Sequence, residues 1–222
     1  MKPTRAAWFF VAGLVWLVLR GILVQALPQI RTDHLAENGG VLLLIPMISV
    51  VASLAVPVFF LTFLRHHSFE GQRMLRIATS IAAVASVLAF FLAVAALVTA
   101  IKGIRPPDWS WLLSSPGLRQ TILILLIGSL FLFLLIFARS GSFPERLRKA
   151  ASVGAVGAMV SMVMVVVWVL YSRFPDSLVW YPAVSGSLFS KITGLAAAGT
   201  LLWFLETFAT TYDDAGESGG RD

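Results

Sequence analysis

The segment IRPPDWSWLLSSPGLRQT, residues 104–121, carries the residue types best suited to hold a ligand. Trp109 and Trp111 supply indole rings, and Arg119 and Thr121 follow them closely. Aromatic faces beside a cation near the start of a helix form a platform for a flat, apolar, anionic ligand. The alternative is that both rings belong to the aromatic belt that membrane proteins carry at the lipid–water boundary.

The same segment ends with the pattern of a helix start. Ser114 or Ser115 can serve as the N-cap, and Pro116 suits the first helical position because its missing N–H is not needed there. We therefore expect a helix to begin at Pro116, directly after the tryptophan-bearing loop.

The histidines offer the other ligand chemistry. His34 lies among acidic neighbours in a polar loop, where a weak metal or haem-edge site is one interpretation and a plain surface loop is the other. His66 and His67 follow a long apolar block beside Arg65, and we expect both rings to be solvated at the membrane interface. The sequence contains no cysteine, HExxH, GxSxG or Gly-rich phosphate loop. We therefore expect no catalytic residues and no metal site, so the protein is not expected to be an enzyme.

The elements that must position these residues are helices in a membrane. Hydrophobic residues make up 58% of the chain and charged residues 13%, which is not the composition of a soluble protein. The apolar residues form continuous blocks of about twenty, the length that a helix needs to cross about 30 Å of hydrocarbon. We predict an all-α fold with six spans, at 6–27, 41–64, 75–101, 121–138, 151–171 and 188–209. One membrane domain would occupy residues 1–212, and an acidic, Gly-rich, disordered tail residues 213–222.

The basic residues predict the orientation of these spans. They lie at helix ends instead of forming the continuous face that a nucleic acid would need, so no nucleic-acid partner is expected. With both termini cytoplasmic, the inside segments hold ten of them and the outside segments six, which favours that orientation. The inside set is Lys2, Arg5, Arg65, Arg73, Arg76, Arg139, Arg146, Arg148, Lys149 and Arg221; the outside set is Arg31, Lys102, Arg105, Arg119, Arg173 and Lys191.

Small residues predict close helix packing on the fifth block. Gly154, Gly157, Ala158 and Ser161 fall on one face of a helix there. Because small side chains let backbones approach each other, we expect this face to pack against a neighbouring helix.

The outer loop resembles that of the tryptophan-rich haem-handling proteins of cytochrome c biogenesis, the CcmC and CcsA type. Their loop reads roughly W-x-W-D-P/A-R-x-T, and WSWLLSSPGLRQT keeps this order with looser spacing. LLIP at 43–46 stands where the family has L-H-V-P, AALVTAIKGIRPPDW corresponds to A-x-x-T-G-x-x-W, and YSRFPDSLVWYP takes the place of P-x-x-Y-P-S-L-H-P. The likeness covers most of the chain.

The chain also departs from the family pattern. The two histidines that bind haem iron in the family correspond to Leu44 and to the neighbourhood of Val179 and Trp180, and leucine offers no lone pair to iron. Leu112 stands where the family has an acid after the second tryptophan. If haem binds, its iron ligand would come from a partner chain, or binding would be weak.

The resemblance implies a haem-handling or cytochrome c assembly protein of the bacterial inner membrane. Trp109 and Trp111 would stack on the porphyrin and Arg119 would pair with a propionate, with Thr121 and Trp180 as further haem contacts. The implied partners are an ABC-type haem-release complex or a haem chaperone, besides membrane lipid. The alternative is an accessory or structural subunit of a larger membrane complex, with no ligand of its own.

Overall fold

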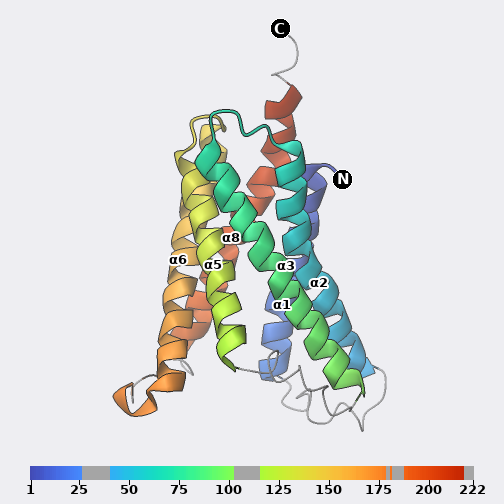
Figure 1. Cartoon of the computed structure of the whole chain (residues 1–222), viewed down its shortest axis with the longest axis vertical. Helices are drawn as coiled ribbons and strands as arrows, with labels where there is room; N and C mark the ends of the chain where they lie inside the picture. The colour runs from blue at the N-terminus through green and yellow to red at the C-terminus, as the bar shows by residue number, and fades with distance from the viewer. Residues whose placement is uncertain (27–40, 103–115, 179–180, 182–187, 218–222) are drawn as a thin grey trace.

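Six long α-helices make up the computed structural model of the chain, which describes residues 1–26, 41–102, 116–178, 181 and 188–217 (Figure 1). No strand occurs in these ranges. The elements are α1 (Pro3–Ala26), α2 (Val41–His66), α3 (Arg73–Lys102), α5 (Pro116–Arg139), α6 (Glu145–Arg173), the short 3-10 helix η3 (Pro175–Ser177) and α8 (Leu188–Glu217).

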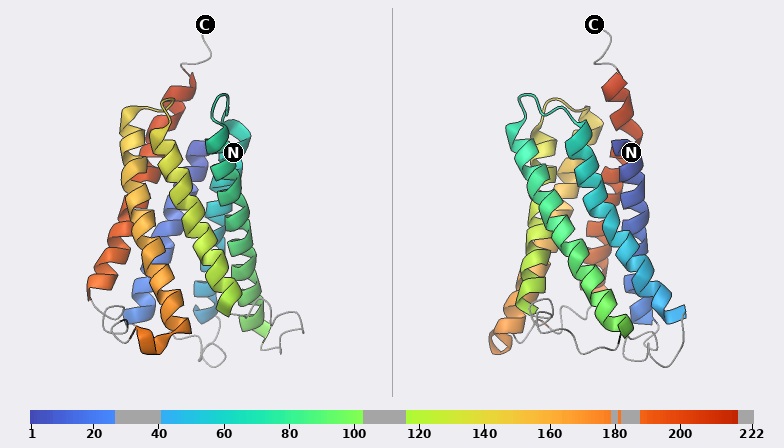
Figure 2. Two further views of the ribbon diagram at one scale, coloured as in Figure 1. Left: turned by 60° about the vertical axis from the view of Figure 1, so that its left-hand side comes forward. Right: turned by 45° about the vertical axis from the view of Figure 1, so that its right-hand side comes forward.

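The helices form a closed ring in which each packs against its neighbours in sequence. The main contacts join α1 to α2, α2 to α3, α3 to α5, α5 to α6 and α6 to α8, and α8 returns to α1. The helices alternate in direction, so α1 begins and α8 ends at the same end of the bundle (Figures 1 and 2). We call this the terminal end, and the end where α5 begins and α6 ends the distal end.

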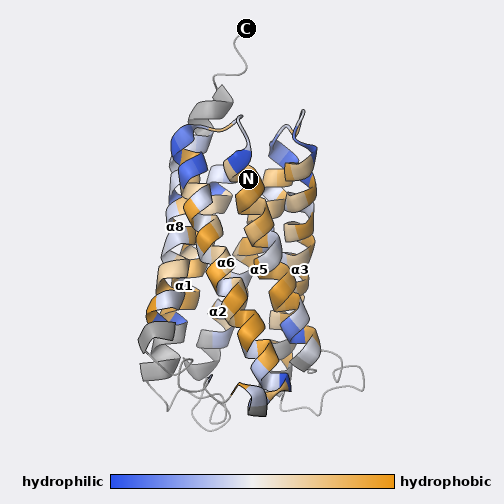
Figure 3. Cartoon of the chain, turned by 90° about the vertical axis from the view of Figure 1, so that its left-hand side faces the viewer, coloured by the Kyte–Doolittle hydropathy of each residue, from blue (hydrophilic) through white to orange (hydrophobic). Residues whose placement is uncertain are grey.

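Five of the helices are long and apolar enough to cross a membrane, which confirms a helical membrane protein. Most residues along the helices are hydrophobic, and hydrophilic residues lie mainly near the helix ends (Figure 3). The remaining helix, α1, has 24 residues and carries Arg5 and Arg20. The candidate spans are Pro46–His66, Arg73–Ala95, Gly117–Arg139, Glu145–Arg173 and Lys191–Tyr212.

The helix bounds agree with the predicted blocks, and most extend beyond them. The helix α5 begins at Pro116, as its N-terminal pattern predicts. The helix α8 runs to Glu217 and so includes the first part of the predicted tail over 213–222, whereas 218–222 lie outside the described residues.

The core is concentrated in the terminal half of the bundle. Its centre is a set of phenylalanines from α2, α5, α8 and the turn before α6 that meet across the interior; Phe59, for example, contacts Phe133 at a ring-centroid distance of 6.4 Å and Phe208 at 5.3 Å. We call this set the aromatic cluster: Phe59, Phe60, Phe63, Phe133, Phe137, Phe143, Phe204 and Phe208, each 5% exposed or less.

The predicted small-residue face of α6 does pack against other helices. Gly154, Gly157 and Ala158 are buried. A methyl group on Gly154 would contact Leu134 of α5 and Phe204 of α8, and one on Gly157 would overlap Thr200 of α8. The glycines therefore set how closely α6 approaches its neighbours.

Candidate functional site

The described part of the predicted haem site lies at the distal end, in the first turns of α5. Arg119 is exposed. Thr121 is exposed as well, but its hydroxyl donates to the Gly117 carbonyl at 2.8 Å. Both side chains therefore lie at the surface of this turn, and the Thr121 hydroxyl is engaged within the helix.

Gln120 fixes the position of this turn relative to α6. Its side chain is 6% exposed, and its Nε2 donates to the Ser172 hydroxyl at 2.9 Å. Ser172 in turn donates to the Val169 carbonyl at 2.7 Å. Because a buried amide is costly to leave unpaired, this contact holds the start of α5 to the end of α6.

The same contact brings a second arginine to the turn. Arg173 is the last residue of α6 and is exposed, and a methyl group on Gly117 would lie 3.6 Å from its guanidinium. Arg173 and Arg119 thus come from different helices and both lie around the N-terminus of α5. A helix N-terminus carries partial positive charge, so this corner of the bundle favours an anion.

Two tyrosines lie near this corner, Tyr171 in the last turn of α6 and Tyr181 after η3. The rings of Tyr171 and Tyr181 lie with centroids 4.7 Å apart at an interplanar angle of 32°. Burial raises the pKa of Tyr181, and the neighbouring Tyr171 adds to this effect. Tyr181 therefore stays a neutral phenol at physiological pH.

The structure bears on only part of the predicted haem site. Arg119 and Thr121 share one helix turn at the distal end. Trp109, Trp111 and Trp180 lie outside the described residues, as does His34. The sequence patterns missed Gln120, Ser172 and Arg173; the signal available was a polar residue near the end of each of two apolar blocks.

A second polar site lies at the terminal end, around His67. This residue follows α2 and is half-buried, with its ring stacked on Phe63 at 4.8 Å and 10° and on Phe143 at 5.2 Å and 26°. Phe69 meets it edge-on at 4.8 Å and 90°. The prediction that both histidines are solvated is therefore wrong for His67, although His66 is exposed. The physical reason is that His67 lies one helical turn beyond Phe63, on the face that packs into the aromatic cluster.

Hydrogen-bond partners at both ring nitrogens select one tautomer of the neutral His67 ring. Gln72 Nε2 donates to the Ser142 hydroxyl at 2.9 Å, which leaves Gln72 Oε1 as the acceptor 3.4 Å from His67 Nε2. The Nε2 proton of His67 is therefore donated to Gln72, and Nδ1 accepts from the Tyr212 hydroxyl at 3.1 Å. The result is a chain of donors running from Tyr212 through His67 and Gln72 to Ser142.

The surroundings of His67 disfavour its charged form. Burial among aromatic rings lowers its pKa, and the hydrogen bond to Gln72 opposes this in part. Because both nitrogens already have protein partners, neither is available to bind a metal or haem iron. No group of three or more histidine or acidic residues that could bind a metal is found in the described ranges.

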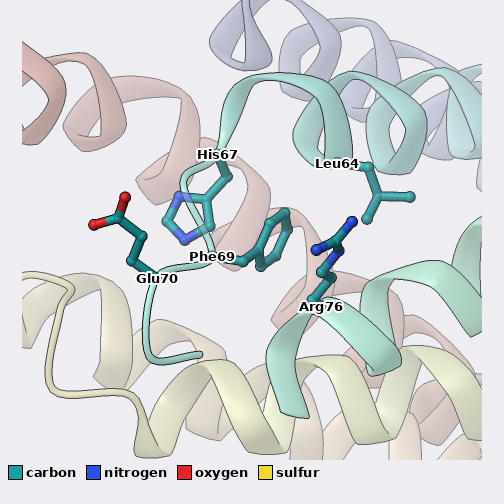
Figure 4. A pocket seen from close by; sticks show the side chains of 5 residues that line it. All are labelled: Leu64, His67, Phe69, Glu70 and Arg76. Carbon is teal, nitrogen blue, oxygen red and sulfur yellow. The ribbon is translucent and has the colours of Figure 1, made fainter. Parts of the chain in front are cut away.

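A small open cavity adjoins this site. It has a volume of about 380 Å³ and is lined by Leu64, His67, Phe69, Glu70 and Arg76 (Figure 4). Its walls combine the apolar side chains of Leu64 and Phe69 with the His67 ring, the Glu70 side chain and the exposed guanidinium of Arg76.

Comparisons with known proteins identify no relative of this chain. No protein-family model matches it, and neither a curated protein nor a solved structure does.

Proposed function

We propose that the chain crosses the bacterial inner membrane six times, with both termini in the cytoplasm. Five of the six helices have the length and composition of membrane spans, and α1 closes the ring between α2 and α8. Because α1 packs between two spans, we expect it to cross the membrane beside them. The distribution of basic residues supports the orientation, which assigns the distal end to the outside.

Site-specific labelling tests this topology, because the chain contains no cysteine and each introduced thiol is unique. Gly141 is exposed in the turn at the terminal end, and Ser177 is exposed in η3 at the distal end. In intact cells a membrane-impermeant maleimide should label Ser177→Cys, and should label Gly141→Cys only after lysis. The reverse labelling pattern would contradict the proposed orientation.

At the distal end, we propose, the protein handles haem during cytochrome c assembly. One observation carries this: Arg119 and Arg173, from different helices, lie around the first turn of α5, directly after the tryptophan-bearing segment. A porphyrin that stacks on Trp109 and Trp111 would direct its propionates to these guanidinium groups. Thr121 and Trp180 are the remaining proposed contacts.

The described residues fit the edge of haem but not its iron. Histidine is the usual strong ligand of haem iron, and both described histidines, His66 and His67, belong to the terminal end. The iron ligand would come from a partner, such as a haem chaperone or an ABC-type release complex, or haem would bind weakly. This suits transient delivery of haem and not a catalytic function.

Titration of the purified protein with haem in lipid nanodiscs tests the proposal. The wild type should shift the Soret band and approach saturation. The double variant Arg119→Gln, Arg173→Gln should bind about tenfold more weakly or worse, because charge-assisted hydrogen bonds to an anion are each worth about 1.5–3 kcal/mol. Arg139→Gln is the matched control, since Arg139 ends α5 at the opposite end of the same helix. An equal loss in both variants would argue against a distal site.

A second candidate is an accessory subunit of a larger membrane complex. The observation in its favour is the set of large apolar side chains exposed on the outer faces of the helices, among them Val84 at 62% and Phe91 at 62%. Lipid or a partner helix could cover such a face. A protein that leaves the Soret band unchanged but migrates with a stable partner complex from mild detergent would support this candidate over haem handling.

A further inference from the structure

We propose that the cavity at the terminal end binds the headgroup of an anionic phospholipid, with Arg76 as the phosphate ligand. The cavity lies between the end of α2 and the start of α3, beside Leu64 and Arg76. The candidate spans of these helices end at His66 and begin at Arg73, so the cavity lies at the depth of the lipid headgroups.

The charge of this region matches a phosphate. Arg65, Arg73 and Arg76 are exposed, and Glu70 is the only carboxylate in the segment 65–76. Figure 4 places the Glu70 carboxylate on the far side of His67 and Phe69 from the Arg76 guanidinium. Within the part of the chain that the structure describes, the Arg76 side chain pairs with no carboxylate. An exposed guanidinium in this position can donate two hydrogen bonds to one phosphate.

The apolar surface below the cavity suits acyl chains. Leu64 and Phe69 line the cavity itself. On the outer faces of α2 and α3, exposed apolar side chains continue away from it, at spacings of three and four residues that keep them on one helix face. They are Leu61 at 52%, Ile77 at 45%, Ile81 at 45% and Val84 at 62%. A free phosphate would contact only the Arg76 guanidinium, whereas a phospholipid would contact both the guanidinium and the apolar side chains of α2 and α3.

Native mass spectrometry with defined lipids tests this inference. The wild type should retain phosphatidylglycerol in preference to phosphatidylcholine. Arg76→Gln should weaken phosphatidylglycerol binding by about tenfold or more, because the charge-assisted hydrogen bonds of the guanidinium to the lipid phosphate are lost, and Arg76→Lys, which keeps the charge, should lose less. Arg139→Gln is the control, because Arg139 is exposed at the same end but does not line the cavity.

The outcomes separate a lipid from other ligands. A wild type without preference between the two lipids would overturn the inference, whatever the variants do, as would equal losses in Arg76→Gln and Arg139→Gln. Inorganic phosphate, added to protein in pure phosphatidylcholine nanodiscs, should not raise the melting temperature. A rise that Arg76→Gln abolishes would assign the cavity to free phosphate instead. Because the haem titration concerns the opposite end of the bundle, its result is independent of this one.

Discussion

The Nδ1 atom of His67 lies 3.1 Å from the hydroxyl of Tyr212, although 145 residues separate the two in sequence. This contact joins the turn after α2 to the last turns of α8. The Tyr212 ring also stacks on Phe208 at a centroid distance of 4.5 Å and an angle of 18°. At the terminal end, the hydrogen bonds that join Tyr212, His67, Gln72 and Ser142 therefore lie beside the aromatic cluster.

Removing the Tyr212 hydroxyl should destabilise this end. In Tyr212→Phe the ring can still stack, but His67 Nδ1 loses its donor, so the free energy of unfolding should fall by about 1 kcal/mol. Thermal unfolding in nanodiscs measures this. Tyr171→Phe is the control, because the Tyr171 hydroxyl makes no hydrogen bond to a described residue; an equal change in both variants would contradict a specific role for the bond.

Stability should depend on pH through His67. Its folded-state pKa is lowered from the ordinary value of 6.5, so the unfolded chain binds the proton more readily. The contribution of His67 to stability is therefore fully present above pH 6.5 and is lost as the pH falls from 6.5 through the folded-state pKa. In His67→Phe, which keeps an aromatic ring but has no titrating group, melting temperatures between about pH 5 and pH 8 should vary less than in the wild type. His66→Gln should keep the wild-type profile, since His66 is exposed; a flattened profile there instead would show that the dependence does not come from His67.

Close packing of α1 on α2 should make Gly13 intolerant of a side chain. A methyl group there would lie 2.7 Å from the Ala52 carbonyl oxygen and 3.0 Å from Ala55 Cβ. Gly13→Ala should therefore cost about 1–3 kcal/mol through overpacking. Gly199→Ala is the matched control, because nothing lies within 4 Å of its added methyl. Unfolding measurements should find the control neutral or slightly stabilised, and a Gly13→Ala variant as stable as the wild type would contradict the packing.

Phe63 should be the most sensitive position of the aromatic cluster. Its ring contacts Phe59, Phe133, Phe137 and Phe208 and is fully buried. Phe63→Ala should cost about 3 kcal/mol, the low end of the range for a buried phenylalanine, because lipid is as apolar as the core and packing alone is lost. The control Phe91→Ala, 62% exposed, should change stability little by the same unfolding assay.

The helices could be predicted because their signals are local. Continuous apolar blocks indicate the spans, and the serines before Pro116 indicate where α5 begins. The spacing of Phe59, Phe63 and His67 also contains a signal for the inward face, since residues four apart share a side of a helix. The neighbouring Arg65 and His66 instead suggest that His67 is exposed to solvent.

The partners of these residues could not be predicted in the same way. Tyr212 and Phe143 reach His67 only because α8 and the turn before α6 return to the end of α2. Gln120 and Ser172 likewise meet through the α5–α6 pairing, 52 residues apart in sequence. Such contacts depend on the order of the helices around the ring, which no single segment encodes. The roles of Trp109, Trp111 and Trp180 stay predictions.

Haem binding by tryptophan variants tests the central proposal most directly. Haem should be titrated into wild-type protein, the double variant Trp109→Ala, Trp111→Ala, and the control Trp168→Ala, whose ring is 42% exposed on α6. The account predicts a saturable Soret shift in the wild type and the control, and a much weaker one in the double variant. No shift in the wild type, or an unchanged shift in the double variant, would contradict it.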